Sequence, residues 1–418
     1  MRIYRHVVCL SLWAAAAAWG HQQPTSLLIL EAQADRVSVR LHLPLNELEL
    51  AFGHTVTDRP AERMSAWAGD LRRYLRSHLR AETLDGRPWA VEIGEVRLTH
   101  AEQPQSGPFD ELLADAVLTP PPGGANVREF VLRYDAILHQ VVTHRVIVSV
   151  GRDWQGGNVE GDVLLGRIVT DTGTGRVEPF VVRLGTGSSW DGFAAMVRLG
   201  MRHIREGTDH MLFLLVLLLP LPYTFGKMAR IITAFTLGHS LTLLAGALDW
   251  LRLPQQPVEI LIAISILVTA VHAIRPLFPG REAAVTAGFG MVHGMAFATV
   301  LSGLHLPPGQ MALSILGFNL GIELMQLLVV ALTLPWLILL ASSEGVHRWV
   351  RIGGATFAAI AACGWILNRV TGEPNSIERA MAAAGDLAPA GIFILAGIAL
   401  PVHLYQSFLK RRQNEQLI

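Results

Sequence analysis

The pattern of hydrophobic and polar positions changes character near residue 190. From residue 21 up to that point, apolar residues recur in short stretches, several of them alternating with polar residues, and charged residues are frequent. Beyond it, residues 210–409 consist of long apolar runs that short polar loops interrupt. Alternation is typical of half-buried strands, whereas runs of this length are typical of membrane helices. The pattern therefore predicts one domain at 21–190 and a membrane domain at 191–418.

The domain at 21–190 has the pattern of a β-rich fold. Glycine and proline separate short stretches rich in β-branched residues, which predict strands at 27–31, 37–43, 91–98, 129–134, 145–150 and 179–184. One helix interrupts them, because apolar residues recur mostly at three- and four-residue steps, namely Met64, Trp67, Leu71, Tyr74, Leu75 and Leu79. A sandwich-like fold with one inserted helix accounts best for this order.

Seven later segments are long enough to span a bilayer, and they predict an α-helical polytopic bundle. They lie at about 200–222, 230–249, 257–274, 283–303, 310–340, 352–369 and 388–408. Lysine and arginine concentrate in alternate loops, at Lys227, Arg230, Arg275, Arg281, Arg348, Arg351, Lys410, Arg411 and Arg412. This asymmetry predicts that these loops and the C-terminus are cytoplasmic, with residues 21–190 on the opposite side.

The first twenty residues resemble a secretory signal peptide. Arg2 and Arg5 form a basic start, 7–18 an apolar core, and 18–20 a small-x-small cleavage site. An uncleaved anchor is the alternative. Cleavage would make His21 the first residue and would place the domain at 21–190 in the periplasm of a bacterium. The chain is then a multi-pass protein of the inner membrane, with the lipid bilayer as a partner.

Composition excludes several classes of function. The 418 residues carry 34 basic and 34 acidic side chains, so net charge gives no reason to expect nucleic acid as a partner. The two cysteines, Cys9 and Cys363, lie outside 21–190, which excludes disulfides and thiolate metal sites there. The sequence contains no glycine-rich phosphate loop, and nothing in it predicts ATP hydrolysis or an organic cofactor.

The membrane segments contain an excess of ionisable and amide side chains. A charged group at the middle of a membrane helix costs about 2.5–3.5 kcal/mol on insertion scales, so such groups need partners. Imidazole, carboxylate and amide ligands suit nickel, cobalt or zinc. The sequence therefore predicts a divalent-metal site formed by His203, Asp209, His210, His239, His293, Asn319 and Glu323. On continuous helices, His203 would share a face with His210, and Asn319 with Glu323.

Several of these residues have structural alternatives. Asp209 follows Arg205 by one helical turn and could form an interfacial ion pair with it. A single mid-membrane histidine such as His239 often bonds a neighbouring helix. Glu259 is better explained by a preference for a helix N-terminus at the water boundary. Thr233, Thr236 and Ser240 are interpreted as packing contacts rather than ligands.

At these motifs the sequence resembles the HupE/UreJ membrane proteins, most closely the branch with a large exported N-terminal domain. The resemblance rests on His203-x5-Asp209-His210, His239-Ser240, His293-Gly294 and Phe318-Asn319-x-Gly321-x-Glu323. It implies nickel or cobalt permease activity, and metal-handling roles for the first motif and His293. The chain departs from the well-known nickel permeases at the motif that begins with His293. Those permeases carry a second histidine four residues after the first histidine of this motif, and the motif then ends in Gly-x-Glu. Phe297, Ala298 and Val300 occupy those positions.

Three functions compete. A divalent-metal permease is the first, and it needs no catalytic residue. An intramembrane zinc hydrolase of the alkaline ceramidase type is the second, with His210, His239 and His293 holding zinc while Asp209 or Glu323 activates water. The third is a sensor or assembly factor whose exported domain binds a periplasmic protein. The density of buried polar residues favours the first two. The identity of the metal, the direction of transport and the oligomeric state stay open.

Overall fold

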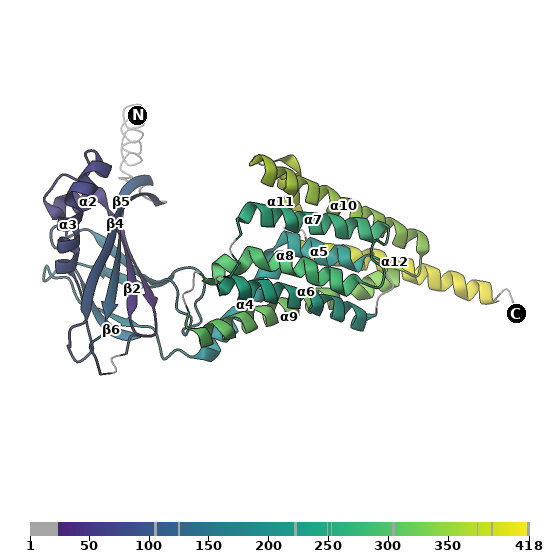
Figure 1. Ribbon diagram of the computed structural model, residues 1–418, viewed down its shortest axis with the longest axis horizontal. Coiled ribbons are helices and arrows are strands. Elements are labelled where there is room, and N and C mark those ends of the chain that lie inside the picture. Colours follow the sequence, from purple (N-terminus) through teal and green to yellow (C-terminus); the bar gives the residue numbers. More distant parts are fainter. Residues whose placement is uncertain are drawn as a thin grey trace, which may run out of the picture. The chain divides into compact units, whose positions relative to one another are not determined.

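A computed structural model describes residues 24–415 (Figure 1), and they form two compact units, one that ends at Asp191 and one that begins at Gly192. The predicted signal peptide and His21 lie outside the described residues. Within 24–415 the description omits 104–106, 124–125, 221–223, 249, 252, 303–305, 374 and 386–387, and also the side chains of 298–302, 381–394 and 409–415.

Two sheets form the framework of the N-terminal unit. The larger has the order β4-β5-β2-β1-β7-β8 and the smaller the order β3-β6-β9. Neighbouring strands are antiparallel except β1 and β7, which are parallel. The strands are β1 Ser26–Ala32, β2 Val37–Pro44, β3 Leu79–Glu82, β4 Ala90–Gln103, β5 Gly107–Thr119, β6 Glu129–Tyr134, β7 Arg145–Val150, β8 Val163–Val169 and β9 Phe180–Arg183. All six predicted strands are present, together with β3, β5 and β8.

Both sheets and two helices enclose one hydrophobic core. Alternation turns one face of each strand inward, as where Leu28 of β1 lies opposite Leu41 of β2 and both are fully buried. Helix α3 (Pro60–His78) buries Leu71 and Leu75 against this core, which confirms the predicted helix. The prediction of one inserted helix is wrong, because α2 (Leu45–Phe52) also covers the core. Its eight residues are too few for a helical period to stand out.

Two sets of buried polar side chains in this unit are paired. Arg128 donates two hydrogen bonds to the carboxylate of Asp153, at 2.6 and 2.7 Å. Ser26 Oγ lies 2.8 Å from Nε2 of His144, whose Nδ1 contacts the carboxylate of Glu47. The second group has the order of a catalytic triad, but Ser26 is fully buried. We therefore assign it a structural role at the end of the core.

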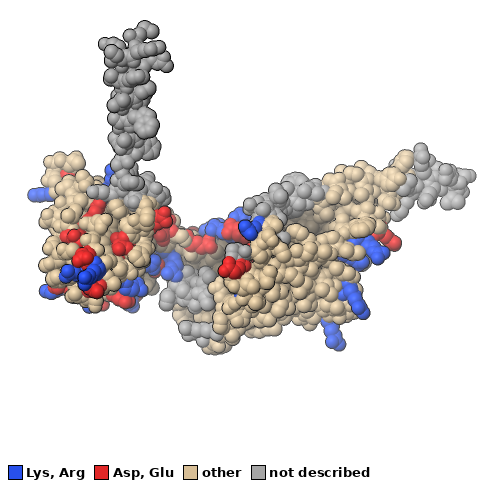
Figure 2. Space-filling view, turned by 90° about the horizontal axis from the view of Figure 1, so that it is seen from above, with Lys and Arg blue, Asp and Glu red and all other residues tan. Residues whose placement is uncertain are grey.

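The second unit is helical. Its elements are α4 Ser189–Glu206, α5 Thr208–Leu218, α6 Phe225–Ala247, α7 Gln255–Ile274, α8 Glu282–Ser302, α9 Pro308–Leu340, α10 Glu344–Thr371, α11 Ser376–Gly385 and α12 Ala388–Glu415. Among the described residues, α6, α7, α9 and α10 are long and apolar enough to cross a membrane. Uncharged residues cover most of the visible surface of this unit (Figure 2). The chain is a membrane protein, and the count of seven spans stays a prediction.

The first predicted membrane segment is not one continuous helix. The helix breaks at Gly207, which separates α4 from α5 with an extended backbone (φ −73°, ψ 94°). A β-carbon at this position would lie 2.7 Å from the carbonyl oxygen of His203 and 3.0 Å from Nδ1 of His210. Glycine therefore permits a close approach that another residue would obstruct. The expectation that His203 and His210 share a face of one helix is wrong, although the break still brings their rings together.

Glycines also bring pairs of helices into backbone contact. A β-carbon added to Gly238 of α6 or to Gly290 of α8 would collide with a carbonyl oxygen of the other helix of that pair. The same holds for Gly200 of α4 and Gly321 of α9. Small residues at membrane helix contacts permit such an approach, and dispersion and Cα–H···O contacts then stabilise the pair. These glycine contacts hold α6, which carries His239, against α8, which carries His293, and hold α4, which carries His203, against α9.

Candidate metal centre

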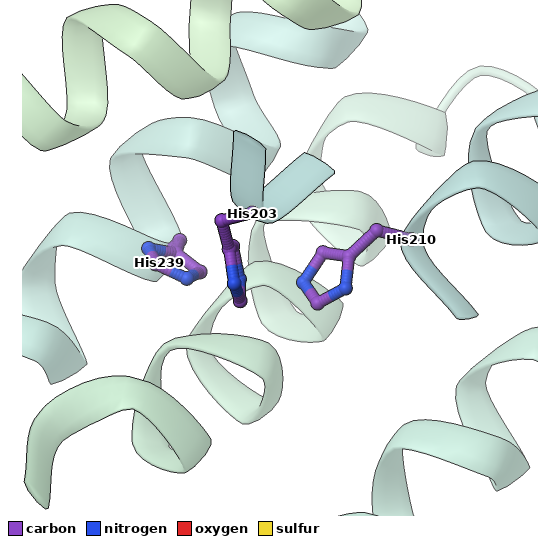
Figure 3. A group of neighbouring side chains, drawn as sticks. All are labelled: His203, His210 and His239. Atoms are coloured by element: carbon purple, nitrogen blue, oxygen red, sulfur yellow. The ribbon is translucent and has the colours of Figure 1, made fainter. Parts of the chain in front are cut away.

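Three histidines from three helices meet within the membrane unit. His203 comes from the last turn of α4, His210 from the first turn of α5 and His239 from the middle of α6. Each offers a nitrogen ligand atom, and these atoms all lie within 4.8 Å of one another. The ring of His203 lies between the other two (Figure 3). His210 and His239 are buried and His203 is partly buried. A small movement of the side chains would place all three at coordinating distance from one ion, about 2.0–2.1 Å for nitrogen.

The cluster contains buried nitrogens without partners. Among the described residues, neither ring nitrogen of His239 has a hydrogen-bond partner, and neither does Nε2 of His203. An unpartnered polar atom in a dry interior costs about 1–3 kcal/mol. A metal ion that accepts one lone pair from each ring would remove part of this cost.

A hydrogen-bonded chain orients His210 within the cluster. Its Nδ1 lies 3.0 Å from Oδ1 of Asp209, and its Nε2 lies 3.3 Å from Nδ1 of His293. The carboxylate can only accept, so Nδ1 of His210 carries the proton and Nε2 accepts the hydrogen bond from Nδ1 of His293. A metal bound at Nε2 of His210 would have to displace that hydrogen bond. Nε2 of His293 lies in turn 3.0 Å from the hydroxyl of Ser265. Asp209 is therefore placed to orient a ligand, and it forms no ion pair with Arg205 among the described contacts, where Arg205 pairs with Glu206.

Asn319 and Glu323 extend the polar region along α9. Asn319 neighbours His239. Its side-chain amide donates a 2.8 Å hydrogen bond to the carbonyl of Ile315, and its buried side-chain oxygen has no hydrogen-bond partner among the described residues. Glu323 accepts a 2.5 Å hydrogen bond from Thr233 of α6. The structure thus brings together His203, Asp209, His210, His239 and His293. The carboxylate of Glu323 is instead hydrogen-bonded to Thr233.

Two threonines of α6 hydrogen-bond polar side chains of α9. Thr233 hydrogen-bonds Glu323, and Thr236 hydrogen-bonds Gln326 at 3.2 Å. That these threonines are packing contacts rather than ligands stays a prediction. Together with His239 they recur every three residues on α6, which places them on neighbouring positions of one face. That periodicity was the signal that could have linked them to the site.

A cavity of about 330 Å³ borders the cluster. Its walls include His203, Asp209 and His210, and also Glu259, Trp365 and Arg369. The helix break at Gly207 also lines it, in agreement with the rule that irregular backbone at membrane depth lines a cavity. Glu259 forms an ion pair with Arg369 of α10 in addition to standing near the start of α7. Sequence reasoning gave Trp365 and Arg369 no role, because only the fold brings α10 to this cavity.

Aromatic rings close the other side of the cluster. Phe297 stacks on Phe318 with ring centroids 4.2 Å apart, and His203 lies 4.9 Å from Phe297 and 5.4 Å from Phe318. Phe297 occupies the position where the resemblance implied a second histidine. In this chain an apolar ring stands there, and His203 and His239 supply imidazoles from other helices.

One comparison with known proteins gives a match, and it covers most of the membrane unit. Residues 181–369 match the family model described as HupE / UreJ protein, and the matched range contains all the histidines of the cluster. No curated protein and no solved structure matches the chain.

Proposed function

We propose that this chain, whose residues 181–369 belong to the HupE/UreJ family, carries a divalent transition-metal ion across a membrane. The family is associated with nickel and cobalt transport, which makes these ions the preferred cargo. We further propose that the membrane is the bacterial inner membrane, with the N-terminal unit in the periplasm and the C-terminus in the cytoplasm. The metal is a substrate in this proposal.

The observation that supports transport is the cluster of His203, His210 and His239. Three imidazoles favour nickel, cobalt and zinc over magnesium or calcium, which prefer oxygen ligands. The unpaired nitrogens of His203 and His239 and the adjoining cavity suit an ion that must enter and leave. The described part of the cluster offers no thiolate, which would select a softer ion.

The polar side chains suggest a route. An ion in the cavity first meets Asp209 and the cluster, and Asn319 then leads along α9 to Glu323. Imidazoles must be unprotonated to bind metal, so loading the cluster releases protons and unloading takes them up. Transport would therefore depend on the proton concentration on both sides of the membrane.

Metal uptake in whole cells tests this proposal. Cells that express the parent chain should accumulate radioactive nickel or cobalt faster than cells with His210→Ala or His239→Ala, whereas Glu323→Gln should give intermediate uptake. His347→Ala is the matched control, because this histidine lies on α10 in the same unit and outside the cluster. Equal accumulation in all five strains, at equal amounts of protein in the membrane, would refute the permease proposal.

The cavity favours one second candidate, an intramembrane zinc hydrolase. Catalytic zinc takes three protein ligands and an open position, and here Asp209 stands at a cavity beside three histidines. Purified protein supplied with zinc would then cleave an amide-linked lipid such as ceramide, and His239→Ala would not. Zinc-dependent turnover together with unchanged uptake would replace the permease proposal by this one.

A further inference from the structure

A second cluster of histidines lies in the N-terminal unit, outside the family match. His78 ends α3, and His139 follows β6 in a turn that begins at Asp135. Both rings border a cavity of about 460 Å³. Their centroids are 4.2 Å apart and their planes differ by 17°, so the two imidazoles stack. This places two ligand-bearing rings from distant parts of the sequence at the same cavity wall.

The hydrogen bonds fix the proton on the same nitrogen of each ring. Nδ1 of His78 lies 2.8 Å from Oδ1 of Asp135, and Nδ1 of His139 lies 3.1 Å from the carbonyl oxygen of Asp135. Both oxygens accept, so both Nδ1 atoms donate and both Nε2 atoms keep their lone pairs. Histidines that bind metal commonly donate their second nitrogen to a carboxylate or a carbonyl in this way. A single residue, Asp135, orients both rings.

The turn that carries His139 is held in an unusual conformation. Ile137 is fully buried and has a φ of 68°, a region that β-branched residues rarely occupy. Its N–H donates a 3.0 Å hydrogen bond to the hydroxyl of Tyr74, and the ring of Tyr74 lies 4.6 Å from His78 and 5.8 Å from His139. The fold thus sustains a strained backbone where it presents these rings.

The groups around the cavity discriminate between kinds of ion by their ligand type. Arg80, Arg133 and Arg176 line it along with Asp135 and Glu178, and Arg133 is paired with Glu82 at 2.6 Å, so the positive and negative charges balance. A hard cation would be held mainly by carboxylate oxygens, of which the cavity offers few. Nickel, cobalt, copper and zinc bond directly to imidazole nitrogen, which the two rings supply.

We propose that His78 and His139 form a second transition-metal site on the N-terminal unit. The Nε2 atoms would bind one ion at about 2.0–2.1 Å each. The stacked rings must splay to do so, and the solvent-exposed side chain of His139 can make this movement. Water or Glu178 would complete the coordination. Binding at this site does not depend on transport, but its use as a receiving site for cargo rests on the proposed function.

Metal binding by the full chain purified in detergent tests the proposal. Equilibrium dialysis against nickel chloride should give two ions per chain for the parent and one for a variant with both His78→Gln and His139→Gln. His139→Gln alone, at an exposed position, should lower nickel affinity of this site at least about tenfold while leaving the fold intact. His100→Gln is the control, because His100 is also exposed and paired with an aspartate but has no second ring stacked on it among the described contacts.

The outcomes separate this site from the membrane cluster. A loss of one ion with His78→Gln and His139→Gln but none with His239→Gln would support this site and refute the membrane one. The reverse result, or equal effects of His139→Gln and His100→Gln, would overturn the present proposal. Calorimetric binding of inorganic phosphate that the double variant abolishes, without any change in nickel stoichiometry, would assign the cavity to an anion and overturn it as well.

Discussion

The contact between α6 and α8 allows a sharp test of how the helices position the membrane cluster. Gly290 of α8 lies against the carbonyl oxygen of Phe235 of α6, and a β-carbon there would also lie 3.1 Å from the backbone nitrogen of His239. His293 follows Gly290 by three residues on the same helix. The variant Gly290→Ala therefore inserts one methyl group between the two helices that carry His239 and His293.

The magnitude follows from two opposing effects. Alanine favours a helix over glycine by about 1 kcal/mol. The methyl group, however, must reach an ordinary carbon–oxygen distance of about 3.3–3.6 Å, which forces the helices apart by about 1 Å. Overpacking of this kind costs about 1–3 kcal/mol. Metal–ligand distances tolerate only about 0.2 Å, so the displacement must be reversed when metal binds. Strain of about 1–3 kcal/mol corresponds to roughly 5- to 150-fold weaker nickel binding.

The assay measures nickel affinity and thermal unfolding of the purified chain in detergent. Gly288→Ala is the matched control, because this glycine lies two residues earlier on α8 and a β-carbon there has no described atom within 4 Å. Gly288→Ala should leave nickel affinity unchanged and raise the melting temperature slightly. Identical affinity and stability in the two variants would show that the glycine contact does not position the cluster, and the reasoning would be refuted.

Other predictions concern stability. Asp153→Asn removes the charge that faces the buried guanidinium of Arg128, so it should lower the free energy of unfolding by about 3–5 kcal/mol. Glu129→Gln changes an exposed ion pair and should lower the free energy of unfolding by at most about 1 kcal/mol. Equal losses for the two variants in denaturant unfolding would contradict this prediction. The hydroxyl of Thr57 and neighbouring backbone N–H groups hold the pKa of Glu49 below its usual value. The folded pKa is the lower one, so this stabilisation is present above the unfolded pKa of about 4.3 and is lost as the pH falls through the folded value. The melting-temperature difference between parent and Glu49→Gln should accordingly shrink on acidification, and a difference independent of pH would contradict it. Free nickel at one hundred times its dissociation constant should stabilise the membrane unit by about 2.7 kcal/mol, a shift that a chelator reverses; an unchanged melting temperature would argue against specific binding.

The sequence was informative where local patterns decide structure. Six strands and α3 were predicted because alternation and helical periodicity mark them directly. The parallel pairing of β1 with β7 could not be predicted, since the two strands are far apart in the sequence and only the finished sheet brings them together. The break at Gly207 was missed because a glycine inside an apolar run is equally compatible with a continuous helix.

The candidate site shows the same division. The cost of burying polar groups identified the histidines and acids one by one, but it said nothing of how far apart they lie. Convergence of His203, His210 and His239 depends on the break at Gly207 and on the packing of α6. The hydrogen bond of Ser265 to His293 and the cavity wall at Trp365 are products of tertiary structure. Residue types were therefore predictable, whereas their partners were not.

The glycine contacts have a mechanical consequence. Helices whose backbones touch cannot slide past each other without steric collision, so α6 with α8 and α4 with α9 each behave as one rigid helix pair. His239 belongs to the first pair and His203 to the second. Hydrogen bonds from Thr233 and Thr236 of α6 to α9 already join the two pairs, and an ion held by His203 and His239 would add a further link between them. Its binding and release would then change how firmly the two helix pairs are held together.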